Sequence, residues 1–173
     1  MKKLFTTIAL FCFFNATAQN TADVPEDKPV TINGIDYSYA IRNERNEDTY
    51  SRYEIAIMAQ NKSGCPLIYL KNKTSSMSFD EDPSAIARFD CLNATGKRLT
   101  SKGGNLRAKP FYVPYALTEK TADGKTTTTD VKVEGGYLLK NEASVSNTFI
   151  VIVPKGERPK FKVRVQSFSE LSN

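Results

Sequence analysis

Arg52-Tyr53-Glu54-Ile55-Ala56-Ile57-Met58-Ala59 is the stretch that decides the fold class of this chain. Apolar side chains occupy every second position from Tyr53 to Ala59, and the charged Arg52 and Glu54 fall between them. Successive side chains of a β-strand point to opposite faces, so this period predicts a strand with one face buried and the other in water. The same period recurs at Ile35–Arg42 and at Lys160–Gln166, and we expect a strand at each.

Six further strands are expected from short apolar or β-branched runs bounded by turn residues. They are Pro66–Lys71, Ala85–Leu92, Leu106–Val113, Thr127–Glu134, Tyr137–Lys140 and Phe149–Val153. The last run is apolar at every position, which predicts a central strand covered on both faces. The turn at Pro154–Pro159 should join it to the final strand as a long hairpin. Gly103–Asn105 and Gly135-Gly136 are also expected to be turns.

The spacing of these strands indicates the fold class. No stretch after residue 18 shows a sustained helical period, so the domain should be all-β. Eight or nine short strands at intervals of roughly ten residues are typical of an antiparallel sandwich or a small barrel. We predict a single antiparallel immunoglobulin-like β-sandwich over residues 30–170, with a small up-and-down β-barrel as the alternative.

The first 18 residues have the three parts of a cleavable export signal. Lys2 and Lys3 give a positive start, and Leu4–Phe14 is an apolar run too short to span a bilayer. Small residues precede the expected cleavage site near Ala18. The protein should therefore be secreted or periplasmic, without a membrane span. Residues 19–29 are polar and contain two prolines, which predicts a flexible leader ahead of the domain.

Removing the signal changes both the charge and the cysteine count. The net charge falls from +5, with 24 basic and 19 acidic residues, to +3, with 22 and 19, because Lys2 and Lys3 are lost. So mild a charge does not by itself indicate a nucleic-acid partner. Cys12 also leaves, and the remaining pair predicts a Cys65–Cys91 disulfide in an oxidising compartment. Two separate thiols are the alternative, because a bridge requires the two Cα atoms to lie close together.

Several stretches carry the turn and core residues of a known family. They are Glu54–Ser63, Cys65–Tyr69, Phe89-Asp90, Ala94–Lys97 and Phe149–Lys155. In this order they resemble the immunoglobulin-like domains of small exported proteins of Bacteroidetes-type bacteria. In those domains an Asn-Lys-Ser turn links the second and third strands, and a Val-Pro-Lys-Gly turn separates the last two. The resemblance implies a non-catalytic binding or accessory module of the cell envelope.

The residue types present argue against most catalytic chemistry. The chain has no histidine, which removes the commonest general base and the commonest zinc ligand, and no catalytic residue, metal or cofactor is predicted. A carboxylate-dependent hydrolase needs only two acidic side chains in a cleft. Two groups offer them, Glu44 with Glu47 and Asp48, and the run Asp80–Asp82. Both groups are also typical of solvated turns, and we expect no enzyme.

Basic and aromatic residues are interleaved at positions 97–115. The candidate site consists of Lys97, Arg98, Lys102, Arg107, Lys109, Tyr112 and Tyr115. Such a pattern suits a polyanion, either an acidic polysaccharide or extracellular DNA, through charge pairing and ring stacking. A solvated strand face is the other interpretation.

These observations favour an exported, non-enzymatic binding or accessory module of the cell envelope that engages a protein or glycan partner. Polyanion binding through residues 97–115 is one alternative, and a β-barrel that binds a small molecule is another. The sequence leaves the oligomeric state open.

Overall fold

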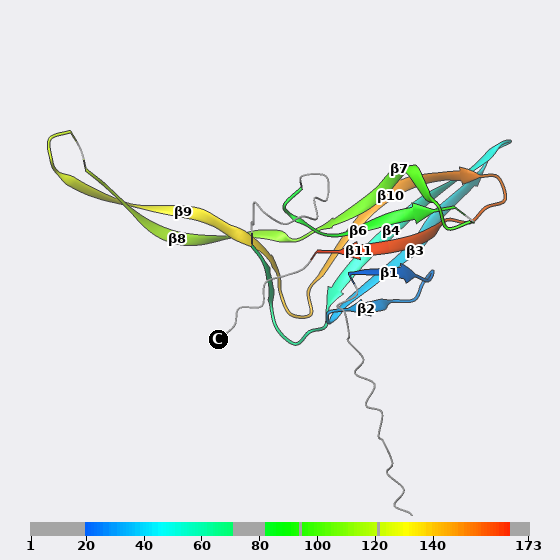
Figure 1. Ribbon diagram of the computed structural model, residues 1–173, viewed down its shortest axis with the longest axis horizontal. Helices are drawn as coiled ribbons and strands as arrows, with labels where there is room; N and C mark the ends of the chain where they lie inside the picture. The colour runs from blue at the N-terminus through cyan, green and yellow to red at the C-terminus, as the bar shows by residue number, and fades with distance from the viewer. Residues whose placement is uncertain (1–19, 71–81, 94, 121, 167–173) are drawn as a thin grey trace, which may run out of the picture.

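The computed structural model describes residues 20–70, 82–93, 95–120 and 122–166, apart from the side chains of residues 100–102. The predicted export signal lies outside the described residues. Within them the chain forms eleven strands and no α-helix, so the predicted all-β class is confirmed (Figure 1). The strands are β1 Thr21–Val24, β2 Val30–Ile32, β3 Ile35–Asn46, β4 Tyr50–Asn61, β5 Leu67–Tyr69, β6 Ala85–Leu92, β7 Arg98–Arg107, β8 Lys109–Lys120, β9 Thr126–Leu139, β10 Ser144–Pro154 and β11 Lys160–Val165.

Two four-stranded antiparallel sheets enclose the core. Sheet A has the order β1-β11-β6-β7, and sheet B has the order β10-β4-β3-β2. Phe161 of sheet A packs edge-on against Tyr39 and Phe149 of sheet B, with ring centroids 4.6 and 5.9 Å apart. The alternating apolar residues of β4 all face this core and are at most 4% exposed. The predicted antiparallel sandwich is thus confirmed, and the apolar residues that alternate in the sequence of β4 are the ones buried between its two sheets.

The strand Phe149–Val153 is not central, contrary to our expectation. It belongs to β10, whose ladder partner is β4 alone, and Ile152 is 48% exposed. The inner strands of sheet B are β4, which pairs with β10 and β3, and β3, which pairs with β4 and β2. The expected hairpin with the last strand is also wrong, because β10 lies in sheet B whereas β11 runs between β1 and β6 in sheet A. The turn after Pro154 therefore crosses from one sheet to the other.

Two glycine pairs that were expected to be turns lie inside strands. Gly104 is buried in β7, where a β-carbon would collide with the ring of Phe149. Gly135 and Gly136 lie within β9, next to a register shift between Phe111 and Tyr112 of β8. In both places the missing side chain lets an aromatic ring approach the backbone, which a turn prediction does not anticipate.

The expected leader at residues 19–29 is folded in large part. β1 pairs with β11, and Val24 is buried in the core. Glu26 then forms a parallel bridge with Tyr39 of β3. The polar composition was misleading because a short edge strand needs only one or two buried side chains. The domain therefore starts near Thr21 rather than at residue 30.

The predicted disulfide is wrong, because Cys65 and Cys91 are both free. Cys65 is exposed beside the end of β4, where Asn61 Nδ2 donates to its carbonyl at 2.8 Å. Cys91 is buried inside sheet A, opposite Phe161 of β11. Burial raises the pKa of the Cys91 thiol to about 12. An even cysteine count did not imply proximity, because Cys65 lies in the connection between β4 and β5 whereas Cys91 lies in β6 of sheet A.

A third sheet, sheet C, contains β5, β9 and β8 in that order. β5 pairs only with the end of β9, at Tyr137–Leu139, which is buried in the body. The remainder of β8 and β9 projects from the sandwich as a long two-stranded ribbon, which we call the arm and define as residues 111–134 (Figure 1). The described residues contain no helix long and apolar enough to cross a membrane.

Candidate functional site

The structure divides the predicted polyanion site between the body and the arm. Lys97 and Arg98 precede or begin β7, whereas Lys109, Tyr112 and Tyr115 lie on β8 beyond its other end. A ten-residue strand spans about 30 Å, so Arg98 is far from the arm. Arg107 pairs with Asp82, with Nε and Oδ2 2.6 Å apart. The side chain of Lys102 lies outside the described residues. These residues therefore do not form one surface.

The arm has one apolar face. Its ladder places Val113 opposite Val133, Tyr115 opposite Val131 and Leu117 opposite Thr129. Cross-strand partners share a face of the ribbon, so these side chains form a continuous stripe. Phe111 extends the stripe toward the body, since a β-carbon at Gly135 would lie 2.6 Å from its ring and 2.9 Å from Val113 Cγ2.

This stripe faces solvent. Val113 is 47% exposed, Tyr115 58%, Leu117 38% and Val133 50%. Among the described residues between Ala108 and Gly136, none belongs to the hydrophobic core. A lone two-stranded ribbon is marginally stable in water, and a contiguous exposed apolar patch marks an interaction site. The arm thus displays residues that a strand ordinarily buries.

The opposite face of the arm, which we call its polar face, carries the charged side chains of β9. It pairs Glu134, Lys132 and Asp130 of β9 with Tyr112, Pro114 and Ala116 of β8, and Tyr112 is 56% exposed. Further out, the hydroxyls of Thr118 and Thr128 lie 3.3 Å apart. Between positions 111 and 134 the sequence has three lysines and four acidic residues, so the arm has a net charge of only −1. The apolar stripe, rather than charge, distinguishes this ribbon.

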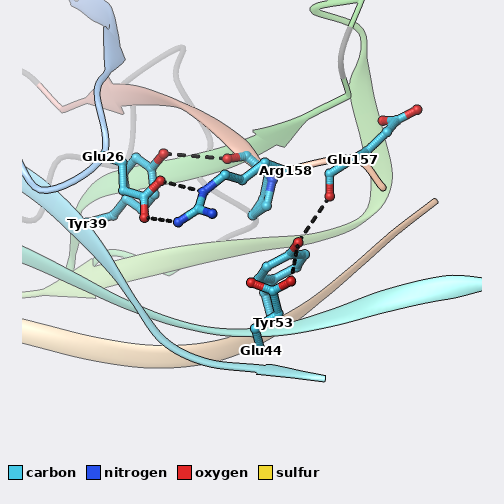
Figure 2. Close-up of polar contacts among 7 residues, drawn as sticks. Glu26, Tyr39, Glu44, Tyr53, Glu157 and Arg158 are labelled. Carbon is cyan, nitrogen blue, oxygen red and sulfur yellow. Dashed lines mark hydrogen bonds and ion pairs between the residues drawn. The ribbon is translucent and has the colours of Figure 1, made fainter. Parts of the chain in front are cut away.

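A polar cluster closes one end of the sandwich (Figure 2). Arg158 donates to both carboxylate oxygens of Glu26, through Nε at 2.8 Å and Nη2 at 2.6 Å. The hydrogen bond from Arg158 lowers the pKa of Glu26. Tyr53 donates its hydroxyl to the Glu157 carbonyl at 3.2 Å and also contacts Glu44 Oε1 at 3.2 Å. These contacts fasten the turn between β10 and β11 to Tyr53 of β4 and to Glu26, which follows β1 (Figure 2).

A pocket of about 640 Å³ lies beside this cluster and is lined in part by Glu26, Tyr39 and Arg158. Burial raises the pKa of Tyr39 to about 12, so its hydroxyl stays protonated at neutral pH. Because Arg158 keeps Glu26 ionised, Glu26 is suited to an ion pair and not to donating a proton. The cluster is therefore organised to hold the turn in place.

The two predicted carboxylate groups do not converge. Glu44 lies close to Glu157, at the end of the sandwich where the turn after β10 is found. Asp82 lies just before β6, and the turn with Glu157 is at the opposite end of β6. Asp80 and Glu81 lie outside the described residues. In the part of the chain that the structure describes, no group of three or more acidic or cysteine side chains is placed to hold a metal ion.

Comparison of the chain with protein-family models, with curated proteins and with solved structures finds no match. The arm was missed in the sequence because its alternation is the same as that of a core-facing strand. The sequence feature that could have indicated the arm is the run of four threonines, Thr126–Thr129. This uncharged run lengthens β9 beyond the part that packs on the body.

Proposed function

We propose that this protein is a non-catalytic binding module of the cell envelope that holds a partner protein through the apolar face of its arm. The observation that carries the proposal is the solvent exposure of Val113, Tyr115 and Val133 on one face of a ribbon that contributes nothing to the core. The export predicted from residues 1–18 would place this partner outside the cytoplasm.

A protein partner suits the chemistry of the arm. An apolar stripe gains free energy when another apolar surface covers it, and aromatic residues are enriched in the centres of protein interfaces. The outer edges of a two-stranded ribbon also present backbone groups to which a partner strand can hydrogen bond. Pro110 and Pro114 remove two donors from β8, so β9 offers the more continuous row of N–H groups.

Site-specific photo-crosslinking tests this function with a matched pair of positions. A photoreactive phenylalanine analogue replaces Tyr115 on the apolar face or Tyr112 on the polar face, which are 58% and 56% exposed. We expect one discrete crosslinked protein in envelope extracts from position 115 and much less of it from position 112. Equal crosslinking from both positions, or none from either, would rule out the apolar face as the binding surface.

A charge-insertion variant gives the affinity of the same contact. Tyr115→Asp places a charge in the stripe without touching the core, so the folded body should be retained. Against the partner identified by crosslinking, we expect a loss of affinity of at least about tenfold, as for an interface residue near the centre. Thr118→Asp, on the polar face, is the control and should bind nearly as the wild type does.

A further inference from the structure

The outer face of sheet A concentrates positive charge that the arm lacks. Its cations lie on three neighbouring strands and are Arg88, Arg98, Arg107, Lys160, Lys162 and Arg164. Among the described side chains on this face of β1, β6, β7 and β11, the acids are Asp23 and Asp90, and Arg107 pairs with Asp82, which precedes β6. The described side chains of these strands therefore include more cations than acids on this face.

Asp90 organises the centre of this face. It is only 5% exposed, and its Oδ1 lies 3.2 Å from Arg88 Nε and 3.0 Å from Arg98 Nε. Its Oδ2 lies 2.7 Å from Arg164 Nε. Gly103 makes room for this arrangement, since a β-carbon there would lie 3.2 Å from Arg88 Nε and 3.4 Å from Asp90 Oδ1. One carboxylate therefore positions three guanidinium groups from three strands.

We propose that this face binds a linear acidic polysaccharide, whose carboxylate or sulfate groups pair with Arg98 and Arg164, the two more exposed of the arginines around Asp90. Guanidinium groups bind planar carboxylates and tetrahedral sulfates through paired hydrogen bonds. Lys160, Lys162 and Arg164 lie in a row along β11, about 7 Å apart, which suits an extended polyanion. This site is separate from the arm and does not depend on the protein partner.

The composition of the face favours a polysaccharide over single-stranded nucleic acid. Proteins that bind single strands stack the bases on aromatic side chains. The aromatic residues of these strands, Phe89 and Phe161, are buried against the core and are at most 1% exposed. The outward positions offer charge and hydrogen-bond donors without a stacking platform.

Calorimetric titration of the mature protein tests the ligand class. Polygalacturonate and heparin are the polysaccharide probes, and an oligothymidylate is the nucleic-acid probe. We expect both polysaccharides to bind at about 50 mM salt and to weaken at least tenfold by about 200 mM. Tighter binding of the oligothymidylate than of both polysaccharides, or no binding of either polysaccharide at low salt, would overturn the proposal.

Two carboxylate substitutions separate an organised site from simple attraction. Asp90→Asn and Asp23→Asn each remove one negative charge from the same face. If charge alone binds the ligand, both variants bind more tightly. Because Asp90 orders three arginines, we expect Asp90→Asn to bind about tenfold more weakly and Asp23→Asn to bind no more weakly than the wild type. Unchanged or tighter binding by Asp90→Asn would overturn the organised site.

Near-ultraviolet circular dichroism shows whether Asp90→Asn folds. If it does not, a second pair of variants tests the same site. Arg164→Lys keeps the charge but loses the forked donor, and Lys160→Arg is the reverse change at the other end of the same row in β11. We expect several-fold weaker binding from Arg164→Lys and no loss from Lys160→Arg. Equal affinity of Arg164→Lys and the wild type would contradict recognition by positioned guanidinium groups.

Discussion

The hairpins β3–β4 and β8–β9 have the same alternation of apolar residues and opposite surroundings. In β4 the apolar positions Tyr53, Ile55 and Ile57 are at most 4% exposed, because sheet A covers them. In the arm Val113, Tyr115 and Val133 are 47–58% exposed, and no residue of the described core lies against them. Alternation therefore marks a face that requires a cover, and another molecule can supply that cover.

The two hairpins also differ in their lateral neighbours. β3 and β4 are flanked by β2 and β10, so their ladder continues on both sides. From Thr126 to Gly136, which is the part of β9 in and next to the arm, the described ladder has β8 as its only partner. Ladder and core support each other in the first hairpin, whereas the arm has only its own cross-strand pairs. Its local stability should therefore be much lower than that of the body.

The largest expected difference is in amide hydrogen exchange. Amides at the centre of β4, such as that of Ile55, should exchange only through global unfolding, whereas those of Val131 and Val133 exchange through local opening. We expect protection in β4 to exceed that in the arm by roughly a thousandfold or more. Exchange measured by NMR checks this. Similar protection in both hairpins would mean that the arm is supported within the protein itself.

Truncation of one apolar residue in each hairpin should separate their effects on stability. Ile57→Ala leaves a cavity between the sheets and should lower the free energy of unfolding by about 2–5 kcal/mol. Val133→Ala, on the exposed stripe, should change it by less than about 0.5 kcal/mol. Urea denaturation followed by circular dichroism measures both. A large cost from Val133→Ala would contradict the independence of arm and core.

A smaller effect is expected where the body packs most tightly. A β-carbon at Gly104 would meet the ring of Phe149 and come within 2.8 Å of Ile57 Cδ1. Gly104→Ala should therefore cost about 1–3 kcal/mol of stability through overpacking. Adding Phe149→Val removes the ring, and the two changes together should cost less than the sum of their separate effects. Strict additivity would show that the ring is not the obstacle.

The smallest effect concerns pH and the cluster that closes the end of the body. Arg158 lowers the pKa of Glu26 below its ordinary value of 4.5. A carboxyl whose pKa is lower in the folded state stabilises the protein above the unfolded pKa, and this contribution is lost as the pH falls through the folded pKa. The wild type should thus lose stability below about pH 4.5 slightly more than Glu26→Gln does. The exposure of Arg158, at 61% of its side chain, keeps the difference small.

The sequence allowed the class and many of the strands to be predicted because alternation is a local property. β6 has the predicted bounds, and the buried positions of β3, β4 and β11 are those that the period indicates. The errors concern pairing between distant segments. Phe149–Val153 was expected to be central because all its residues are apolar, but β4 takes that position and β10 lies at the edge. The residues 97–115 were expected to form one site, but the change from body to arm at Ala108 separates them.

By itself, the sequence determined that this chain forms strands with one apolar face, since the period of two depends only on neighbouring residues. The tertiary structure alone decided which of these faces meet. It buried the stripe of β4 and left that of the arm exposed. It left Cys65 exposed in a connection and buried Cys91 in β6, and it gathered Arg88, Arg98 and Arg164 around Asp90 from three strands. The physical reason is that a hydrophobic face lowers the free energy by being covered but does not specify its cover, which depends on contacts between residues far apart in the chain.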